Sequence, residues 1–246
     1  MSDQSVNSPE IYDSTYFSRA AYEGVSFRRF SQYWWSNRFY ALLAQKYGAR
    51  EGNVLEVGCG MGDLLAWFPH AYRTYGVDVN LWALLLARKN VPQAQFLRLL
   101  AEDLDIFPES YFQIVIAKHI VEHLHDPFAV IGKVSRLLKP GGLLLMATPN
   151  LDSPMRRLKK QNWIGYRDPT HISLKQPSEW LDMLKFCGLV PFRVFSDGFW
   201  DAPYLPLLPK VIQKLLFGAP GGLQAIFVWS IIPVYMGESL IVLARK

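Results

Sequence analysis

The stretch VLEVGCGMGDLL, residues 54–65, joins an apolar run to a loop with three glycines in five positions. The run NVLEV (53–57) predicts a short β-strand, and GDLLAWF (62–68) predicts the start of a helix. A strand that passes through a glycine turn into a helix offers free backbone N–H groups and the positive end of a helix dipole. Asp63 stands where the dinucleotide pattern G-x-G-x-x-G has its third glycine, and no Gly-Lys-Ser/Thr of a phosphate loop follows.

Two acidic residues flank this loop. Glu56 stands two positions before the first glycine, where a carboxylate would repel a pyrophosphate but attract an ammonium group. Asp78 ends the next apolar run about 20 residues after the loop, where a carboxylate can accept both hydroxyls of a ribose. The pattern therefore predicts a nucleoside ligand that carries a cationic, amino-acid-like tail.

Strand-like runs alternate with helical segments over much of the chain. Strands are predicted at 53–57, 72–79, 94–100, 111–118, 142–149, 189–196 and 238–246, and helices at 81–90, within 119–142 and at 177–188. This alternation predicts βαβ units and a parallel sheet covered on both faces. The chain has 246 residues, of which 50% are hydrophobic, so its length and composition fit one domain with a large core.

An ordered set of motifs between about residues 50 and 150 resembles the class I S-adenosylmethionine-dependent methyltransferases. The motifs are VLEVGCGMG, YGVDVN, AEDL, YFQIVIAKHIVEHLHDP, LLKPGG and MATPN. The resemblance implies an α/β fold of the Rossmann-like, doubly wound type, with a seven-stranded, mostly parallel sheet, an antiparallel last strand and helical lid elements. The segment ESLIVLARK (238–246) would be that last strand. The cofactor would be S-adenosyl-L-methionine, and the product S-adenosyl-L-homocysteine.

The resemblance also assigns cofactor-binding residues. Glu56 would orient the amino group, Asp78 would hold the ribose, and Val79 would pack on the adenine. Other positions assigned to the cofactor are Gly58, Cys59, Gly60, Gly62, Ala101, Glu102, Asp103 and Lys118, the last through its backbone. The family often has Asp just before the alanine, where this chain has Leu100. It therefore stays open whether Glu102, Asp103 or only the backbone contacts the adenine amine.

Histidines are the candidate bases for methyl transfer, because removal of a proton from the acceptor is the main acid–base task. His119 follows the fourth predicted strand, at the edge where open α/β sheets bind ligands. His171 lies in the polar turn DPTH, where Asp168 could orient its imidazole. The structural alternatives are a loop-holding hydrogen bond for His119 and a turn-locking role for His171. The pair Glu122-His123 is interpreted as helix-start architecture, and no Cys or His spacing predicts a metal site.

Four regions are distinguished within the single predicted domain. Residues 16–48 are expected to form a helical lid, 50–150 the cofactor-binding core, 151–177 an acceptor-side insertion, and 200–236 an apolar insertion before the last strand. Arg38 in the lid could pair with the cofactor carboxylate, as the resemblance suggests. The basic cluster at 156–160 could contact a phosphate or simply be solvated.

The apolar insertion exceeds what the core fold needs. Leu207, Leu208, Val211, Ile212, Leu215 and Leu216 recur at helical spacing. Four roles stay open for this segment: a cover over a hydrophobic acceptor, contact with a membrane surface through 205–236, a homodimer contact, or packing over the end of the sheet.

These features favour O-methylation of a small-molecule, lipid or glycan acceptor. The alternatives are an RNA or protein methyltransferase and a non-catalytic partner that only binds S-adenosylmethionine. The net charge of +5 permits nucleic acid as a partner, but the fourth strand ends IAKH and lacks the Asn/Asp-Pro-Pro-aromatic motif of base-amine methyltransferases. Two distant cysteines, a polar N-terminus and the lack of a run of about 18 apolar residues predict a cytoplasmic protein, with peripheral membrane contact left open.

Overall fold

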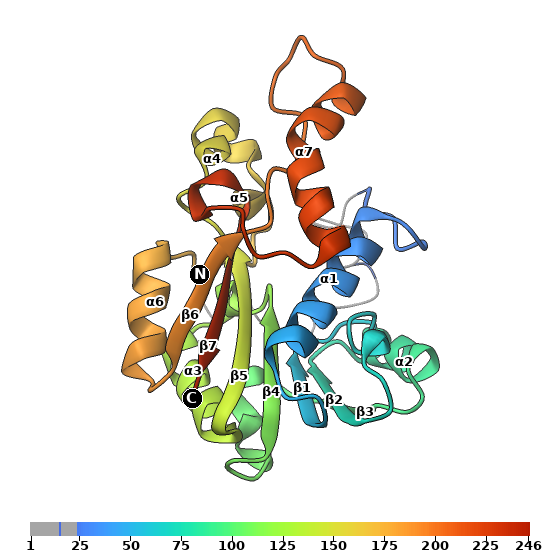
Figure 1. Ribbon diagram of the computed structural model, residues 1–246, viewed down its shortest axis with the longest axis vertical. Coiled ribbons are helices and arrows are strands. Elements are labelled where there is room, and N and C mark those ends of the chain that lie inside the picture. Colours follow the sequence, from blue (N-terminus) through green and yellow to red (C-terminus); the bar gives the residue numbers. More distant parts are fainter. Residues whose placement is uncertain (1–14, 16–23) are drawn as a thin grey trace, which may run out of the picture.

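The computed structural model describes Thr15 and residues 24–246 and contains a seven-stranded sheet (Figure 1). The strands are β1 (Gly52–Val57), β2 (Tyr72–Asp78), β3 (Gln95–Arg98), β4 (Phe112–Lys118), β5 (Leu138–Pro149), β6 (Val190–Ser196) and β7 (Ser239–Arg245). Their order is β3-β2-β1-β4-β5-β7-β6, and β7 runs antiparallel to both β5 and β6. The predicted Rossmann-like sheet with an antiparallel last strand is thus confirmed.

Helices cover both faces of the sheet. They are α1 (Gln32–Tyr47), α2 (Leu81–Asn90), α3 (Pro127–Leu137), α4 (Pro154–Lys159), α5 (Ile164–Arg167), α6 (Pro177–Phe186) and α7 (Lys210–Phe227). Short 3-10 turns are η4 (Leu65–Trp67), η5 (Ala101–Ile106), η6 (Val121–His123), η7 (Lys160–Asn162) and η8 (Val234–Met236). Among the described residues, no helix has the length and apolarity needed to cross a bilayer.

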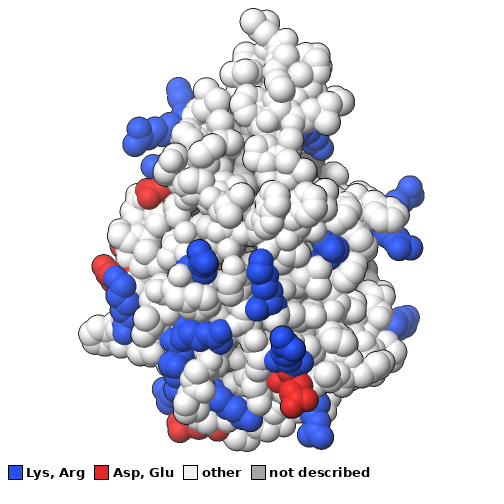
Figure 2. Space-filling view, in the orientation of Figure 1, with Lys and Arg blue, Asp and Glu red and all other residues white. Residues whose placement is uncertain are grey.

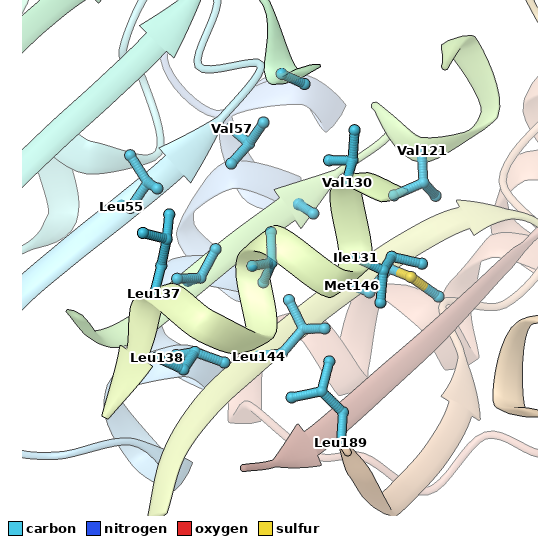
Figure 3. Close-up of a cluster of buried hydrophobic side chains, with 14 of the residues drawn as sticks. Leu55, Val57, Val121, Val130, Ile131, Leu137, Leu138, Leu144, Met146 and Leu189 are labelled. Carbon is cyan, nitrogen blue, oxygen red and sulfur yellow. The ribbon is translucent and has the colours of Figure 1, made fainter. Parts of the chain in front are cut away.

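The core lies in two layers because successive side chains of a strand point to opposite faces. Leu55 and Val57 pack with α3 and α6 on one face, whereas Val54 packs with α1 and α2 on the other. Figure 3 shows the first layer, with residues of β1 and β5 against the apolar side of α3. Burial on both faces explains why these strands read as continuous apolar runs.

The segment after the glycine loop differs from the predicted helix. Residues 62–68 form turns and the single 3-10 turn η4, not the start of an α-helix. Gly62 has a φ of 76°, and Phe68 is extended, as residues before proline usually are. Because both ends of the segment are fixed in non-helical conformations, only one turn fits between them.

The N-terminal helix follows its sequence signals where it is described. Ser31 caps α1 through its side chain, and Gly48 ends the helix with its N–H on the Ala44 carbonyl at 2.7 Å. Residues 16–23 of the predicted lid lie outside the described residues. The insertion forms α7, which extends beyond the predicted helical spacing at 207–216. Figure 1 shows α4, α5 and α7 gathered at one end of the sheet, where β5 leads into α4.

Candidate functional site

A cavity of about 1320 Å³ opens at the carboxyl ends of the parallel strands. The glycine loop, the ends of β2 and β4, one side of α1 and one side of α7 line it. This is the edge at which open α/β sheets bind ligands. Sites for single drug-sized ligands span about 300–1,000 Å³, so this cavity has room for a cofactor and an acceptor together.

The glycine loop adopts a conformation that side chains would disturb. Gly58 has a φ of 74°, and a Cβ there would approach Ile120 to 3.1 Å. A Cβ on Gly62 would come within 3.1 Å of both Ala87 and Phe96. Left-handed backbone and close packing both exclude side chains here. Gly58 and Gly60 therefore present bare backbone to the cavity. The predicted cofactor residue Gly62 does not line the cavity, and its glycine is explained by the close packing against α2 and β3.

Asp78 ties this loop to the end of β2. Its Oδ2 accepts from the Gly60 N–H at 2.7 Å, and its Oδ1 accepts from the Asn80 N–H at 2.8 Å. Burial raises the pKa of this carboxyl, while the backbone N–H groups oppose that rise. Each carboxylate oxygen can accept more than one hydrogen bond, so the expected ribose contact is compatible with this geometry and stays a prediction.

Glu56 and Lys118 both lie on the cavity wall, and their charges influence each other. The Glu56 side chain is buried, and its Oε2 has no hydrogen-bond partner among the described residues. Burial, partly offset by the charge of Lys118, raises the pKa of this carboxyl well above its usual range. The Lys118 ammonium donates to Asn37 Oδ1 at 2.6 Å and faces the rings of Tyr33 and Tyr40. An unpartnered carboxylate oxygen at this place fits an ammonium group of a ligand.

The titration of Lys118 gives a testable pH dependence. Burial lowers its pKa from 10.5 to about 8 in the folded protein. Between these values the unfolded chain binds more protons, so this residue makes stability rise with pH over that window. Lys118→Met should remove up to about 3 kcal/mol of that rise. Urea unfolding at pH 8 and 10.5 would measure it, with Lys185→Met as an exposed control. Equal pH slopes in wild type and Lys118→Met would contradict the assignment.

The other predicted cofactor residues are distributed unevenly around the cavity. Cys59, Val79, Ala101 and Glu102 line it, as does Leu100. Asp103, in η5, is not among the lining residues. Arg38 Nη1 instead donates to the carbonyl oxygens of Ala225 and Ile226, at 3.2 and 3.3 Å, and so ties α1 to the last turn of α7. Its pairing with a cofactor carboxylate stays a prediction and would require these bonds to be exchanged.

His119 stands at the end of β4 in an uncommon backbone conformation. Its φ is 51°, in the left-handed region, and its N–H donates to the Ala147 carbonyl at 2.8 Å. Its Nδ1 lies 3.1 Å from Glu122 Oε1, and the ring borders the cavity. Strained residues held by their surroundings are often found at functional sites. The position suits the predicted base, and the contact with Glu122 would orient the ring.

Asp168 and His171 also border the cavity, but their polar contacts differ from the expected pair. Asp168 Oδ1 accepts from the N–H and the hydroxyl of Thr170, at 2.9 and 2.6 Å. Thr170 Oγ1 lies 2.9 Å from His123 Nδ1, whereas His171 Nδ1 donates to the Gly165 carbonyl at 2.7 Å. Through Thr170, Asp168 therefore orients His123, whose ring lies 4.7 Å from that of His171, centroid to centroid.

Glu122 and His123 are the site residues that the sequence interpretation missed. Both are buried in η6, directly after β4, and His123 lines the cavity. Their position just after the carboxyl end of a central strand is the signal that could have indicated a site role. They do precede a helix, but α3 begins only at Pro127 and has Asp126 as its cap.

Comparison with known proteins finds a matching family model and several relatives of this chain. A family model described as a methyltransferase domain matches residues 27–191. A phosphatidylethanolamine N-methyltransferase from Cereibacter sphaeroides is 32% identical over 166 residues, which is 62% of this chain and 81% of that protein. A ubiquinone biosynthesis O-methyltransferase from Alkalilimnicola ehrlichii is 32% identical over 115 residues, which is 44% of this chain and 46% of that protein.

A further relative from Mycolicibacterium smegmatis, named a probable S-adenosylmethionine-dependent methyltransferase, is 31% identical over 123 residues, or 48% of this chain and 46% of its own. For most of these relatives, the chain therefore spans about half of their length or less. A crystal structure of a SAM-dependent methyltransferase from Archaeoglobus fulgidus superposes with a TM-score of 0.61 at 18% identity. That match covers 85% of this chain and 94% of the other and shows a shared fold.

Proposed function

Because the chain belongs to the S-adenosylmethionine-dependent methyltransferase family, we propose that it methylates a hydroxyl group of an amphiphilic, lipid-type acceptor. When bound, the cofactor supplies a methyl group on a sulfonium, whose departure leaves a neutral thioether. The protein's part is then to align the two reactants, exclude water and help remove the hydroxyl proton.

The residues of the cavity suit this cofactor. Glu56 offers a buried, unpartnered carboxylate oxygen, which suits the ammonium of the methionine portion. The glycine loop offers bare backbone beside it, and Asp78 stands at the end of β2 for the ribose. A pyrophosphate cofactor would meet the negative charge of Glu56, so the donor set favours S-adenosylmethionine over a dinucleotide.

The exposed apolar side of helix α7 is the observation that best supports a lipid-type acceptor. Its cavity side presents Lys210, Lys214, Gly218 and Gly221. Its outer side is apolar and exposed, with Val211 70%, Leu215 67% and Leu216 63% accessible. A helix that only covered the sheet end would place its polar side outward. Figure 2 shows this projecting end of the molecule almost free of charge, while Lys and Arg gather lower on the same face.

The relatives support this class of acceptor. Two of them are named for phosphatidylethanolamine and for ubiquinone biosynthesis. Both of these compounds combine polar groups with long apolar chains. An amphiphile could place its tail along the outer side of α7 and its polar group in the cavity, near Lys210 and Lys214. His119 borders the cavity as a base for a hydroxyl proton, and this favours transfer to oxygen.

A matched panel of amphiphiles tests the proposed reaction. The acceptors would share the same apolar tail and differ only in the head group: a phenol, an alcohol, an amine or a methyl-blocked oxygen. Each would be incubated with methyl-labelled S-adenosylmethionine. We expect label in the hydroxyl compounds and none in the blocked one. Label only in the amine would overturn O-methylation, and label in none of them, with cofactor bound, would overturn the acceptor class.

The apolar side of α7 predicts binding to lipid vesicles. Val211→Ser combined with Leu215→Ser should weaken vesicle co-sedimentation at least about tenfold, because insertion of two such side chains contributes roughly 1.5–3 kcal/mol each. Stability should change by less than about 0.5 kcal/mol, because both residues are exposed. Phe186→Ser on α6, at another exposed apolar residue, is the control. Unchanged vesicle binding, or a wild-type dimer that the double variant dissociates, would contradict the membrane role.

A further inference from the structure

Three potential metal ligands meet beside the cavity from two distant segments. Glu122 and His123 belong to η6, after β4, and His171 follows α5. One ligand atom from each lies within 4.8 Å of the others. Glu122 and His123 are buried, and His171 is half-buried. Two imidazoles and a carboxylate are ligand types that zinc and related divalent cations bind.

One carboxylate oxygen of Glu122 lacks a hydrogen-bond partner among the described residues of this cluster. Its side chain is fully buried. Its Oε1 pairs with His119 Nδ1, but its Oε2 has no hydrogen-bond partner among the described residues. A buried carboxylate oxygen without a partner costs free energy. A cation bound between Glu122 and the two histidines would satisfy that oxygen.

The hydrogen bonds of the two histidines fix their tautomers. The Gly165 carbonyl can only accept, so His171 Nδ1 carries the hydrogen. Thr170 directs its own hydroxyl hydrogen to Asp168 Oδ1, so its oxygen accepts from His123 Nδ1. The lone pair of each neutral ring is therefore on Nε2. Metal-binding histidines usually have this arrangement, in which the other ring N–H donates to a carbonyl or an anchored oxygen.

We propose that Glu122, His123 and His171 bind a zinc-class divalent cation, whose open coordination position takes the hydroxyl oxygen of the methyl acceptor. Three protein ligands leave such a position in catalytic zinc sites. The metal-bound O–H bond breaks and its proton passes to His119; the oxygen then forms a bond to the methyl carbon, and the electron pair of the broken S–C bond stays on sulfur. The cation keeps its oxidation state. The binding site is inferred from the positions of these three side chains and the unpartnered oxygen of Glu122. Its role at the acceptor rests on the proposed function.

Cation binding can be measured without any methyl acceptor. The full chain would be freed of metal with a chelator, dialysed and titrated with Co²⁺, followed by its visible absorption, and then with Zn²⁺ in competition. We expect one equivalent at micromolar or lower Kd. His171→Gln should weaken binding at least about 100-fold, and Glu122→Gln similarly. His70→Gln, at an exposed histidine outside the cavity, should change nothing. Because His171 is only half-buried, its variant keeps the test valid if Glu122→Gln fails to fold.

The outcomes separate the site from its role. No binding below about 1 mM, or equal binding by wild type and His171→Gln, would overturn the site. Binding that depends on His171, without methyl transfer to any acceptor, would keep the site and overturn the proposed function. Once a methyl acceptor is identified, chelation of the metal should lower the rate of methyl transfer at least about tenfold, and added Zn²⁺ should restore it. Transfer that survives chelation undiminished would overturn the role at the acceptor.

Discussion

Glu56→Gln should raise the Kd for S-adenosylmethionine by about 100-fold or more, while the cofactor-free protein stays at least as stable as wild type. Loss of one partner from a buried charge pair costs about 2–5 kcal/mol of binding, and each 1.4 kcal/mol is tenfold in Kd. The buried Oε2 of Glu56 has no hydrogen-bond partner among the described residues, so glutamine loses little within the empty protein. Calorimetric titration and urea unfolding would measure the two effects separately.

The stability part of this prediction follows from the sign of the pKa shift. Burial raises the pKa of the Glu56 carboxyl, so the folded protein binds this proton more tightly than the unfolded chain does. The stability that this group contributes at low pH is therefore lost as pH rises through the folded pKa, and glutamine removes that loss. Glu51→Gln, at an exposed carboxylate near the start of β1, is the control. Unchanged cofactor affinity in Glu56→Gln would contradict the placement of the ammonium.

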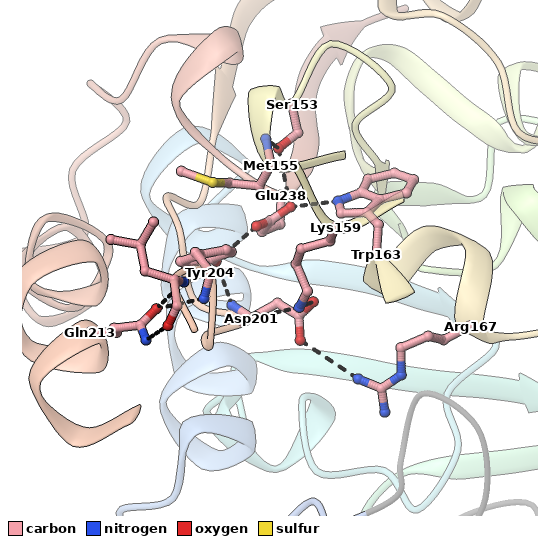
Figure 4. Close-up of polar contacts among 10 residues, drawn as sticks. Ser153, Met155, Lys159, Trp163, Arg167, Asp201, Tyr204, Gln213 and Glu238 are labelled. Carbon is pink, nitrogen blue, oxygen red and sulfur yellow. Dashed lines mark hydrogen bonds and ion pairs between the residues drawn. The ribbon is translucent and has the colours of Figure 1, made fainter. Parts of the chain in front are cut away.

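Glu238→Ala should lower the free energy of unfolding by about 3–5 kcal/mol. Glu238 is fully buried and accepts hydrogen bonds from Trp163 Nε1 at 2.6 Å, Tyr204 OH at 2.8 Å and Ser153 Oγ at 3.1 Å. Figure 4 shows these side chains converging on one carboxylate. Hydrogen bonds to a charged group contribute about 1.5–3 kcal/mol each, and truncation would also leave buried donors unpaired.

This cluster joins three segments around the cavity. Ser153 precedes α4, Trp163 precedes α5, and Tyr204 lies in the insertion before α7. Lys159 and Arg167 extend it through their ion pairs with Asp201. Urea unfolding would compare Glu238→Ala with Glu109→Ala, whose carboxylate is exposed. A loss below about 1 kcal/mol would mean that other contacts hold the insertion in place.

The sheet could be predicted because its signals are local. NVLEV, YFQIVIAK and GLLLMATP are continuous apolar runs that correspond to β1, β4 and β5, and a strand buried on both faces requires such runs. The glycine loop could also be predicted from the sequence, because the left-handed backbone at Gly58 and Gly62 favours glycine. These features depend on neighbouring residues and not on how distant segments meet.

The cluster of Glu122, His123 and His171 could not be predicted in this way. Residues 123 and 171 are separated in the chain by α3, β5, α4 and α5, and only the fold brings their rings together. No spacing in the sequence therefore indicates this contact. The contacts of Arg38 with the end of α7 likewise depend on where the insertion packs. Tertiary placement, not local propensity, determines these parts of the site.

Methyl transfer to a hydroxyl of an amphiphile can be tested with one labelling experiment. The protein would be incubated with methyl-labelled S-adenosylmethionine and an extract of its source cells, and the products divided into organic, small aqueous, RNA and protein fractions. We expect label in the organic fraction, recovered as a methyl ether. Label in RNA or protein, or no label in any fraction while the cofactor is bound, would contradict it.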